Sequence, residues 1–113
     1  MVTLTIHNHR LSIGFRNIVN IDAIVCMLSD INYTKIYLKD GRVKVVSLSI
    51  KYFEEALIDY PFFRSHKCCL VNLNYIVEFY ECDSTFALTN KQIAPISRRK
   101  IKEYKQYISQ LSA

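Results

Sequence analysis

Glycine and proline are scarce in this sequence, with two of each among 113 residues, and tryptophan is absent. Neither glycine, Gly14 or Gly41, stands in a G-x-G-x-x-G or G-x-x-x-x-G-K pattern, which excludes the glycine-rich loops that cradle nucleotide phosphates. The longest apolar run, residues 23–28, has six members, whereas a membrane-spanning helix needs about 20. The first six residues also lack a basic stretch followed by an apolar one, so no secretory signal is predicted.

Cysteine is present, but not at the spacings typical of metal or redox sites. No set of cysteines and histidines has finger or ribbon spacing, so we expect no zinc site and no cofactor. His66 is too close in sequence to Ser65, Cys68 and Cys69 to serve any of them as a base, which predicts a non-enzyme. Without a signal peptide, reduced thiols and a cytoplasmic location are expected. The four cysteines are Cys26, Cys68, Cys69 and Cys82.

The remaining composition indicates a small globular domain. Half of the residues are apolar and 22% are charged, which is typical of a folded chain and not of a disordered one. A chain of this length buries about 60% or more of its unfolded surface. We therefore expect a single domain over residues 1–113.

Alternation of apolar and polar residues at period two dominates the chain and predicts strands. Residues 2–6 alternate cleanly, and 23–28, 33–38 and 43–48 are apolar or β-branched runs. Asp40-Gly41 separates the last two runs and predicts a type I′ hairpin turn, in which both central residues have positive φ. Because successive runs follow at hairpin spacing, we expect mainly β structure in antiparallel sheets. Further strands are predicted over 62–66, 69–71, 75–82, 85–88 and 92–94, with loops at 29–32 and 89–91.

Two segments instead have helical periodicity. Ser49 is a candidate N-cap for a short helix whose apolar side is Ile50, Phe53 and Leu57, and Tyr60-Pro61 would end it. Ser97 is a candidate cap for a C-terminal helix. The apolar stripe of this second helix is Ile101, Tyr104, Ile108 and Leu111.

The net charge of +5 is concentrated in one segment. Residues 91–105 contain six basic side chains and one acidic side chain, Glu103, so this segment has a net charge of +5 and the other 98 residues are neutral overall. A basic patch of this kind attracts polyanions, and salt weakens that attraction. Taken alone, however, a basic run is more often the solvated face of a helix, so composition leaves both interpretations open.

Three groups of motifs resemble the LytTR-type DNA-binding domain. The first runs through Asp22-Ala-Ile, Asn32-Tyr-Thr-Lys-Ile-Tyr-Leu-Lys-Asp-Gly41 and Ser47-Leu-Ser-Ile. The second is Phe62-Phe-Arg-Ser-His-Lys-Cys-Cys-Leu-Val-Asn-Leu-Asn-Tyr-Ile76, similar to the family pattern F-x-R-x-H-r-s-y-x-V-N-x-x-x-I. The third is Pro95-Ile-Ser-Arg-Arg-Lys100, similar to P-V-S-R-R. The resemblance extends over residues 22–103, which is 82 of the 113 residues.

The resemblance implies an elongated, mainly β domain, with a short middle helix and a C-terminal helix, that regulates transcription by binding double-stranded DNA. Family members insert loops into major grooves and commonly bind pairs of direct repeats in promoters, so two copies would meet on the DNA. Such domains are output domains of bacterial response regulators. Only 21 residues precede Asp22, too few for a receiver or membrane module, so we expect a stand-alone regulator or an excised domain.

The family's DNA-contact positions correspond to three places in this chain. Arginine can bind guanine through two hydrogen bonds, which makes Arg64 or Arg98 the candidate base reader. Lysine suits phosphate, so Lys35, Lys67, Lys100 and Lys102 would position the domain. The three places are the segment with Asn32, Tyr33 and Lys35, the segment with Arg64, His66 and Lys67, and the start of the last helix with Arg98 and its neighbour Arg99.

Other interpretations of these residues remain open. His66 could contact DNA or only hold its loop, and Tyr33 could pack on the sheet. Lys67-Cys68-Cys69 departs from the family's basic-Ser-aromatic sequence, and the adjacent thiols could form a redox switch. A domain that binds RNA or single strands would stack bases on aromatic residues, with Tyr33, Tyr37, Tyr52, Phe62 and Phe63 as candidates. A protein-interaction module is the third alternative.

Overall fold

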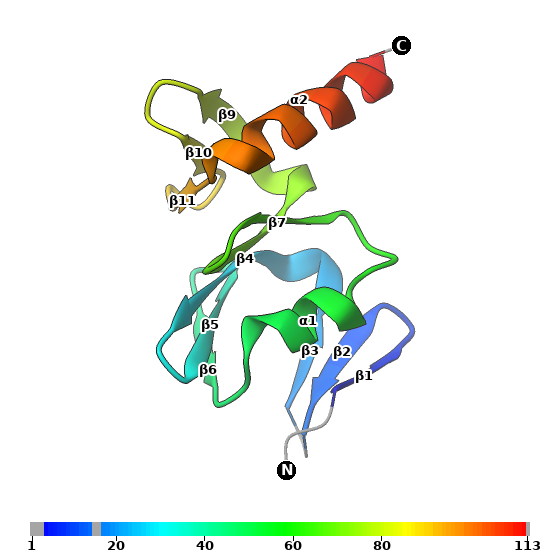
Figure 1. Cartoon of the computed structure of the whole chain (residues 1–113). Coiled ribbons are helices and arrows are strands. Elements are labelled where there is room, and N and C mark those ends of the chain that lie inside the picture. The colour runs from blue at the N-terminus through cyan, green and yellow to red at the C-terminus, as the bar shows by residue number, and fades with distance from the viewer. Residues whose placement is uncertain (1–3, 15–16, 113) are drawn as a thin grey trace.

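The computed structural model describes residues 4–14 and 17–112. Three antiparallel sheets and two α-helices make up the fold (Figure 1), which confirms the predicted mainly β class. The helices are α1 (Ile50–Ala56) and α2 (Arg98–Ser112), and single 3-10 turns lie at η1 (Ile21–Ala23) and η2 (Leu73–Tyr75). The strands are β1 (Leu4–His7), β2 (Arg10–Ile13), β3 (Ile18–Asn20), β4 (Ile24–Asp30), β5 (Tyr33–Leu38), β6 (Val43–Val46), β7 (Phe62–His66), β8 (Cys69–Asn72), β9 (Ile76–Tyr80), β10 (Thr85–Leu88) and β11 (Ile93–Pro95).

A five-stranded sheet in the order β6-β5-β4-β8-β7 forms the middle of the molecule. The sheet β1-β2-β3 and helix α1 lie toward one end of the molecule, and the sheet β11-β10-β9 and helix α2 lie toward the other (Figure 1). All four residues of β8 are buried, as are the first four of β4. The sequence of a strand that is covered on both faces is a continuous apolar run instead of an alternation of apolar and polar residues.

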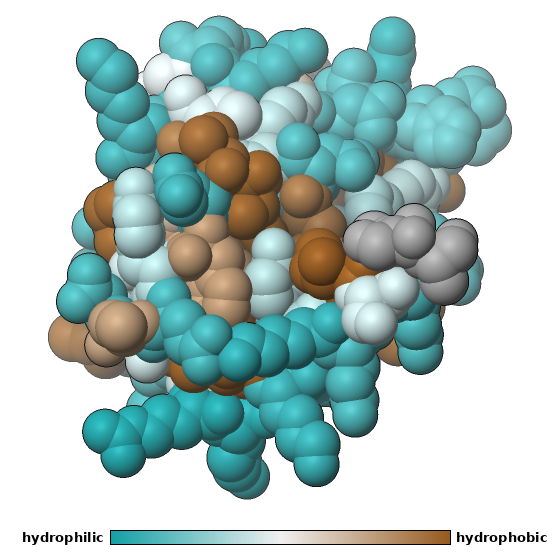
Figure 2. Space-filling model, turned by 90° about the horizontal axis from the view of Figure 1, so that it is seen from above, coloured by the Kyte–Doolittle hydropathy of each residue, from teal (hydrophilic) through white to brown (hydrophobic). Residues whose placement is uncertain are grey.

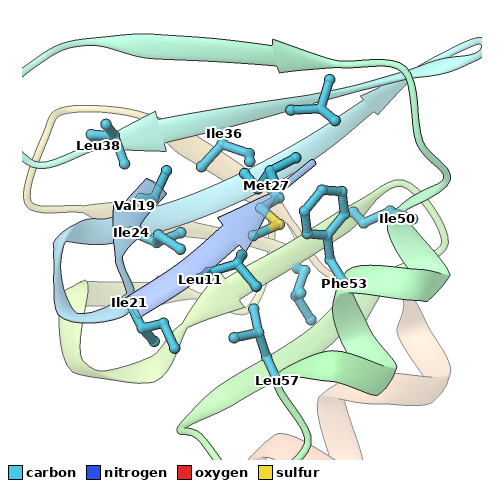
Figure 3. Packing of buried hydrophobic residues seen from close by; sticks show 13 residues of the cluster. Leu11, Val19, Ile21, Ile24, Met27, Ile36, Leu38, Ile50, Phe53 and Leu57 are labelled. Carbon is cyan, nitrogen blue, oxygen red and sulfur yellow. The ribbon is translucent and has the colours of Figure 1, made fainter. Parts of the chain in front are cut away.

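Two separate hydrophobic cores result from this arrangement. Met27 of the middle sheet packs with Leu11 and Phe53 in the first core (Figure 3). Leu70 of the same sheet also belongs to this core. Val71, one residue after Leu70, joins the second core, whose other members include Phe86 and Tyr104. Successive residues of a strand point to opposite faces, so β8 contributes to both cores by simple alternation.

Strand β4 does not alternate in this way. Its pairing with β5 shifts register between Ile24 and Cys26. A bulge adds one residue to a strand and changes which side later residues face. Val25 and Cys26 therefore both belong to the second core, between Ile24 and Met27 of the first.

The turn at Asp40-Gly41 differs from the prediction. Gly41 has a φ of 93°, but Asp40 is not among the described residues with positive φ, so the type I′ assignment is wrong. The Gly41 N–H donates to the Leu38 carbonyl at 3.0 Å, and the Leu38 N–H donates to the Arg42 carbonyl at 2.9 Å. This is a three-residue hairpin loop closed by a glycine bulge.

A turn with two positive φ values joins β1 to β2 instead. Asn8 and His9 have φ values of 53° and 61° and separate the paired residues His7 and Arg10. The predicted strand over residues 2–6 corresponds to β1, although residues 2 and 3 lie outside the described residues. No pattern in the sequence indicated β2 or β3. Residues 29–32 were also predicted as a loop, yet β4 continues to Asp30.

Helix α1 follows its predicted apolar side, whereas α2 follows its predicted stripe only in part, and the side chain of Leu111 lies outside those that the structure describes. Ile50, Phe53 and Leu57 are buried, although α1 ends at Ala56, well before Pro61. The Ser49 side chain makes no capping hydrogen bond. In α2, Tyr104 is buried whereas Ile108 is 39% exposed, because the later turns of α2 extend past the sheet (Figure 1).

Replacement of Phe53 by alanine should strongly destabilise the fold. Its ring is fully buried in the first core, and a Phe→Ala change at such a site costs about 3–5 kcal/mol. Urea unfolding followed by circular dichroism measures the loss. Tyr52→Ala is the matched control, because the Tyr52 side chain is 48% exposed, and a comparable loss there would contradict the assignment of the core.

Candidate nucleic-acid interface

The three predicted contact segments lie along one surface of the molecule. Two shallow hollows connect them. The first is lined by Asn32 and Tyr33 of the β4–β5 hairpin, the second by His66 of the β7–β8 hairpin and Arg99 of α2, and Arg64 and Lys67 line both. We call this surface the basic strip, and its members are Asn32, Tyr33, Arg64, His66, Lys67, Arg99 and Lys100.

Backbone hydrogen bonds fix the segments to one another. The Ser97 N–H, just before α2, donates to the Ser65 carbonyl at 2.8 Å. Ser65 is fully buried, and its hydroxyl donates to the Pro95 carbonyl at 2.7 Å. On the other side, the Ser29 N–H donates to the Cys68 carbonyl at 2.8 Å. The β7–β8 hairpin is thus joined to both neighbours, a role for Ser65 that the sequence analysis missed.

The β4–β5 hairpin ends in a two-residue turn, Ile31-Asn32, between the paired residues Asp30 and Tyr33. Ile31 has a φ of 55°, which is strained for a β-branched residue. Its side chain is 94% exposed. Tyr33 is 49% exposed, so its ring is not buried against the sheet. The Lys35 ammonium lies 3.5 Å from the Asp30 carboxylate, which offsets part of the positive charge of this hairpin.

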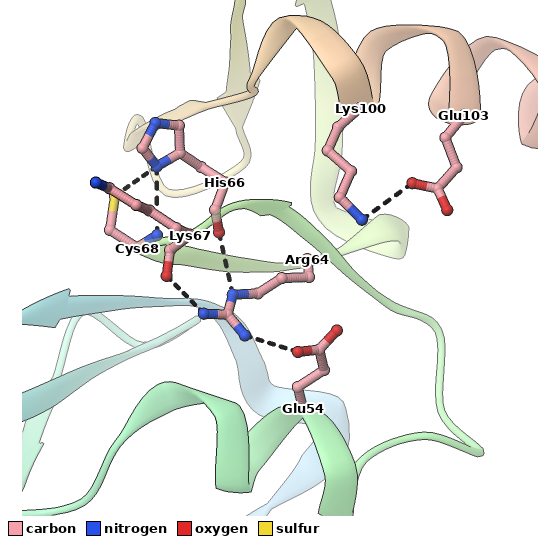
Figure 4. A network of polar contacts seen from close by, with 7 residues as sticks. All are labelled: Glu54, Arg64, His66, Lys67, Cys68, Lys100 and Glu103. Atoms are coloured by element: carbon pink, nitrogen blue, oxygen red, sulfur yellow. Dashed lines mark hydrogen bonds and ion pairs between the residues drawn. The ribbon is translucent and has the colours of Figure 1, made fainter.

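The β7–β8 turn is held from within by Arg64 and His66 (Figure 4). The Arg64 guanidinium donates to the His66 carbonyl at 3.1 Å, to the Lys67 carbonyl at 2.6 Å and to the Glu54 carboxylate at 2.6 Å. His66 Nδ1 accepts from the Cys68 N–H at 3.3 Å and lies 3.1 Å from Cys68 Sγ. Because Nδ1 accepts a backbone hydrogen bond, the neutral ring holds its proton on Nε2.

The basic side chains at the start of α2 differ in their partners. Lys100 lies 3.1 Å from Glu103, and Lys105 lies 2.8 Å from Glu81. Arg98, Arg99 and Lys102 form no ion pair with an acidic residue of the described chain. Seen from the α2 end, long hydrophilic side chains project from the edges of the molecule (Figure 2). Arg99 lines the second hollow beside His66 and Lys67, whereas Arg98 and Lys102 line neither of the two hollows.

The cysteines fall into two classes. Burial raises the pKa of the Cys26 thiol to about 12 and that of Cys69 to about 11. Cys68 is half-buried, whereas Cys82 is exposed and belongs to neither core. Within the described residues no three His, Cys, Asp or Glu side chains come together as a metal site. Across the same residues, α2 included, no helix has the length and apolar character to cross a membrane.

Comparison with known proteins identifies the family. The family model of the LytTr DNA-binding domain matches residues 16–109. The chain belongs to the LytTR family. It is a DNA-binding transcriptional regulator, and the family is not enzymatic. This confirms the resemblance inferred from the sequence motifs.

A solved structure supports the LytTR fold independently. The LytTr DNA-binding domain of a protein from Bacillus cereus, described as a methyl-accepting/DNA response regulator, is 19% identical in sequence. The two folds superpose with a TM-score of 0.70 over 95% of each chain. Comparison with curated proteins gave no significant match.

The classes of thiol predict different reactivity in this LytTR domain. The thiolate is the nucleophile, so the raised pKa values and the burial of Cys26 and Cys69 should protect both from iodoacetamide at neutral pH. Cys82 should be modified first, and Cys26 and Cys69 only in denaturant. Mass spectrometry of tryptic peptides measures each rate, and equal rates for Cys26 and Cys82 would contradict the structure.

Replacement of Ile31 by asparagine should stabilise the LytTR domain. Asparagine tolerates the left-handed conformation that strains isoleucine, and the exposed Ile31 side chain contributes little packing. We expect the free energy of unfolding to rise by about 1 kcal/mol. Ile58→Asn is the control, since Ile58 is 76% exposed and not among the described residues with positive φ. A gain in both variants would refute the role of strain.

Proposed function

We propose that this domain regulates transcription in the bacterial cytoplasm by laying the basic strip along double-stranded DNA. The β4–β5 turn, the β7–β8 turn and the start of α2 would enter successive major grooves, and two copies would bind paired direct repeats. One observation carries the proposal: Arg64 and Lys67 line both hollows, so the three segments share one continuous surface. A duplex needs such an extended, basic surface.

Five members of the basic strip have side chains suited to a direct contact with DNA. Arg99 is our candidate base reader, because it has no acidic partner among the described residues and lines the same hollow as His66. His66 would donate from Nε2–H to a base edge or a phosphate. Asn32 could bind adenine through its amide. Lys67 and Lys100, with Lys35, Lys102 and Arg98 beside them, would contact phosphates.

The placement of the aromatic residues favours a duplex over single strands. Phe62, Phe63 and Tyr37 pack against the two hydrophobic cores. Tyr33 and Tyr52 are the exposed members of the candidate stacking set. Two separate rings do not form the row of stacking surfaces that single-strand binders use.

The two adjacent arginines of α2 should behave differently when replaced by alanine. Arg99→Ala should cost about 1–3 kcal/mol on the preferred site and relax the preference at one base position. Arg98→Ala removes the same charge and should weaken all duplexes alike. Selection of bound sequences from a random duplex library, followed by fluorescence anisotropy, measures both effects. If Arg98→Ala relaxes the base preference and Arg99→Ala does not, Arg98 is the base reader. If the parent domain shows no base preference, sequence-specific binding is refuted.

A phosphate contact by Lys100 predicts a change in salt dependence. Lys100→Ala should weaken binding to every duplex and reduce the slope of log affinity against log salt by about one. Arg10→Ala is the control, because the β1–β2 hairpin lies toward the opposite end of the molecule from α2 (Figure 1). Equal slopes for the parent and Lys100→Ala would place Lys100 away from the phosphates.

A further inference from the structure

We propose that Glu54 of α1 and Arg64 of β7 form a positioning pair that sets the shape of the β7–β8 turn for DNA binding. The inference rests on the proposed function of the basic strip and assigns Arg64 a role other than base reading. Arg64 would act through the turn, and Glu54, which no sequence motif indicated, would act through Arg64.

The contacts of Arg64 are those of an internal brace. Its side chain is 19% exposed, and three of the five guanidinium N–H donors of arginine are engaged by protein acceptors. Two of these acceptors are the carbonyls of His66 and Lys67, consecutive residues of the proposed interface. The third is the Glu54 carboxylate. A planar, rigid fork of donors suits this arrangement, and lysine cannot reproduce it.

The backbone explains why a brace is needed here. The pairing of β7 with β8 shifts register between Phe63 and His66. Such an irregularity disrupts the ladder of backbone hydrogen bonds and changes the direction of nearby side chains. The guanidinium of Arg64 supplies donors to carbonyls at this point, so the turn that presents His66 and Lys67 is fixed by a side chain.

The charge of Glu54 provides a sharp test. A carboxylate beside a DNA-binding surface repels phosphates. If this repulsion were the only effect of Glu54, removal of its charge should strengthen DNA binding. A positioning role predicts the opposite. Glu54→Gln leaves the guanidinium without its charged partner, and the loss of a charge-assisted hydrogen bond should loosen the turn.

The experiment compares Glu54→Gln with Glu55→Gln, the neighbouring exposed acid on α1. Fluorescence anisotropy with the preferred duplex of the parent measures affinity and salt slope, and urea unfolding confirms that each variant folds. Glu54→Gln and Arg64→Lys should each bind about tenfold more weakly with an unchanged salt slope. Glu55→Gln should bind as tightly as the parent or slightly more tightly.

Other outcomes would overturn the pair. Glu54→Gln binding as tightly as Glu55→Gln would exclude a positioning role. Arg64→Ala with a salt slope reduced by about one would instead place the guanidinium on a phosphate. The double variant Glu54→Gln/Arg64→Ala should bind DNA no more weakly than Arg64→Ala. If the losses of affinity in the two single variants add up in the double variant, the two residues act independently. A parent without sequence preference would refute the proposed function itself, which distinguishes the two failures.

Discussion

The burial of β4 and β8 on both faces is the constraint on which the rest of the structure depends. With Ile24, Met27 and Leu70 in one core and Val25 and Val71 in the other, neither strand can move without disturbing both cores. Asn72, the last residue of β8, strengthens this link, because its buried amide donates to the Ile24 carbonyl at 2.9 Å. The two strands therefore act as a fixed frame for the chain segments that leave them.

The basic strip is built on the ends of that frame. The turns that follow β4 and precede β8 both emerge at the same side of the middle sheet, since β4 pairs antiparallel with β8 at Cys26 and Val71. Paired residues in the frame are packed on both faces, whereas the turns are irregular. Their shape depends on local contacts such as the hydrogen bonds of Arg64 and the contact between Cys68 and His66. The frame fixes the positions of the turns, and the side chains of the turns can vary in sequence without altering the cores.

Much of this fold could be predicted from the sequence, and the failures have physical causes. The buried side of α1 and that of the first turns of α2 follow from periodicity, because a single core covers each. The division of residues 24–27 between two cores could not be predicted, since an apolar run contains no information about a bulge. The short strands β2 and β3 could not be predicted because Gly14 and the polar residues that follow it interrupt the apolar alternation between residues 10 and 20.

The candidate site was predicted only in part. The segments came from the motifs, but their partners did not. The bond from Arg64 to Glu54 joins residues ten apart, and the bond from Ser65 to Pro95 joins residues thirty apart. No periodic pattern connects positions at such separations, so the local role of each side chain emerges only once the chain is folded.

The bond between Ser65 and Ser97 also has a consequence for folding. It attaches the start of the last helix to a hairpin far earlier in the chain, so the surface is completed by contacts between distant segments, which form slowly. The basic segment 91–105 has its charge even in an unfolded chain and can attract DNA without regard to sequence. Selective recognition would then begin only when α2 docks against the β7–β8 hairpin.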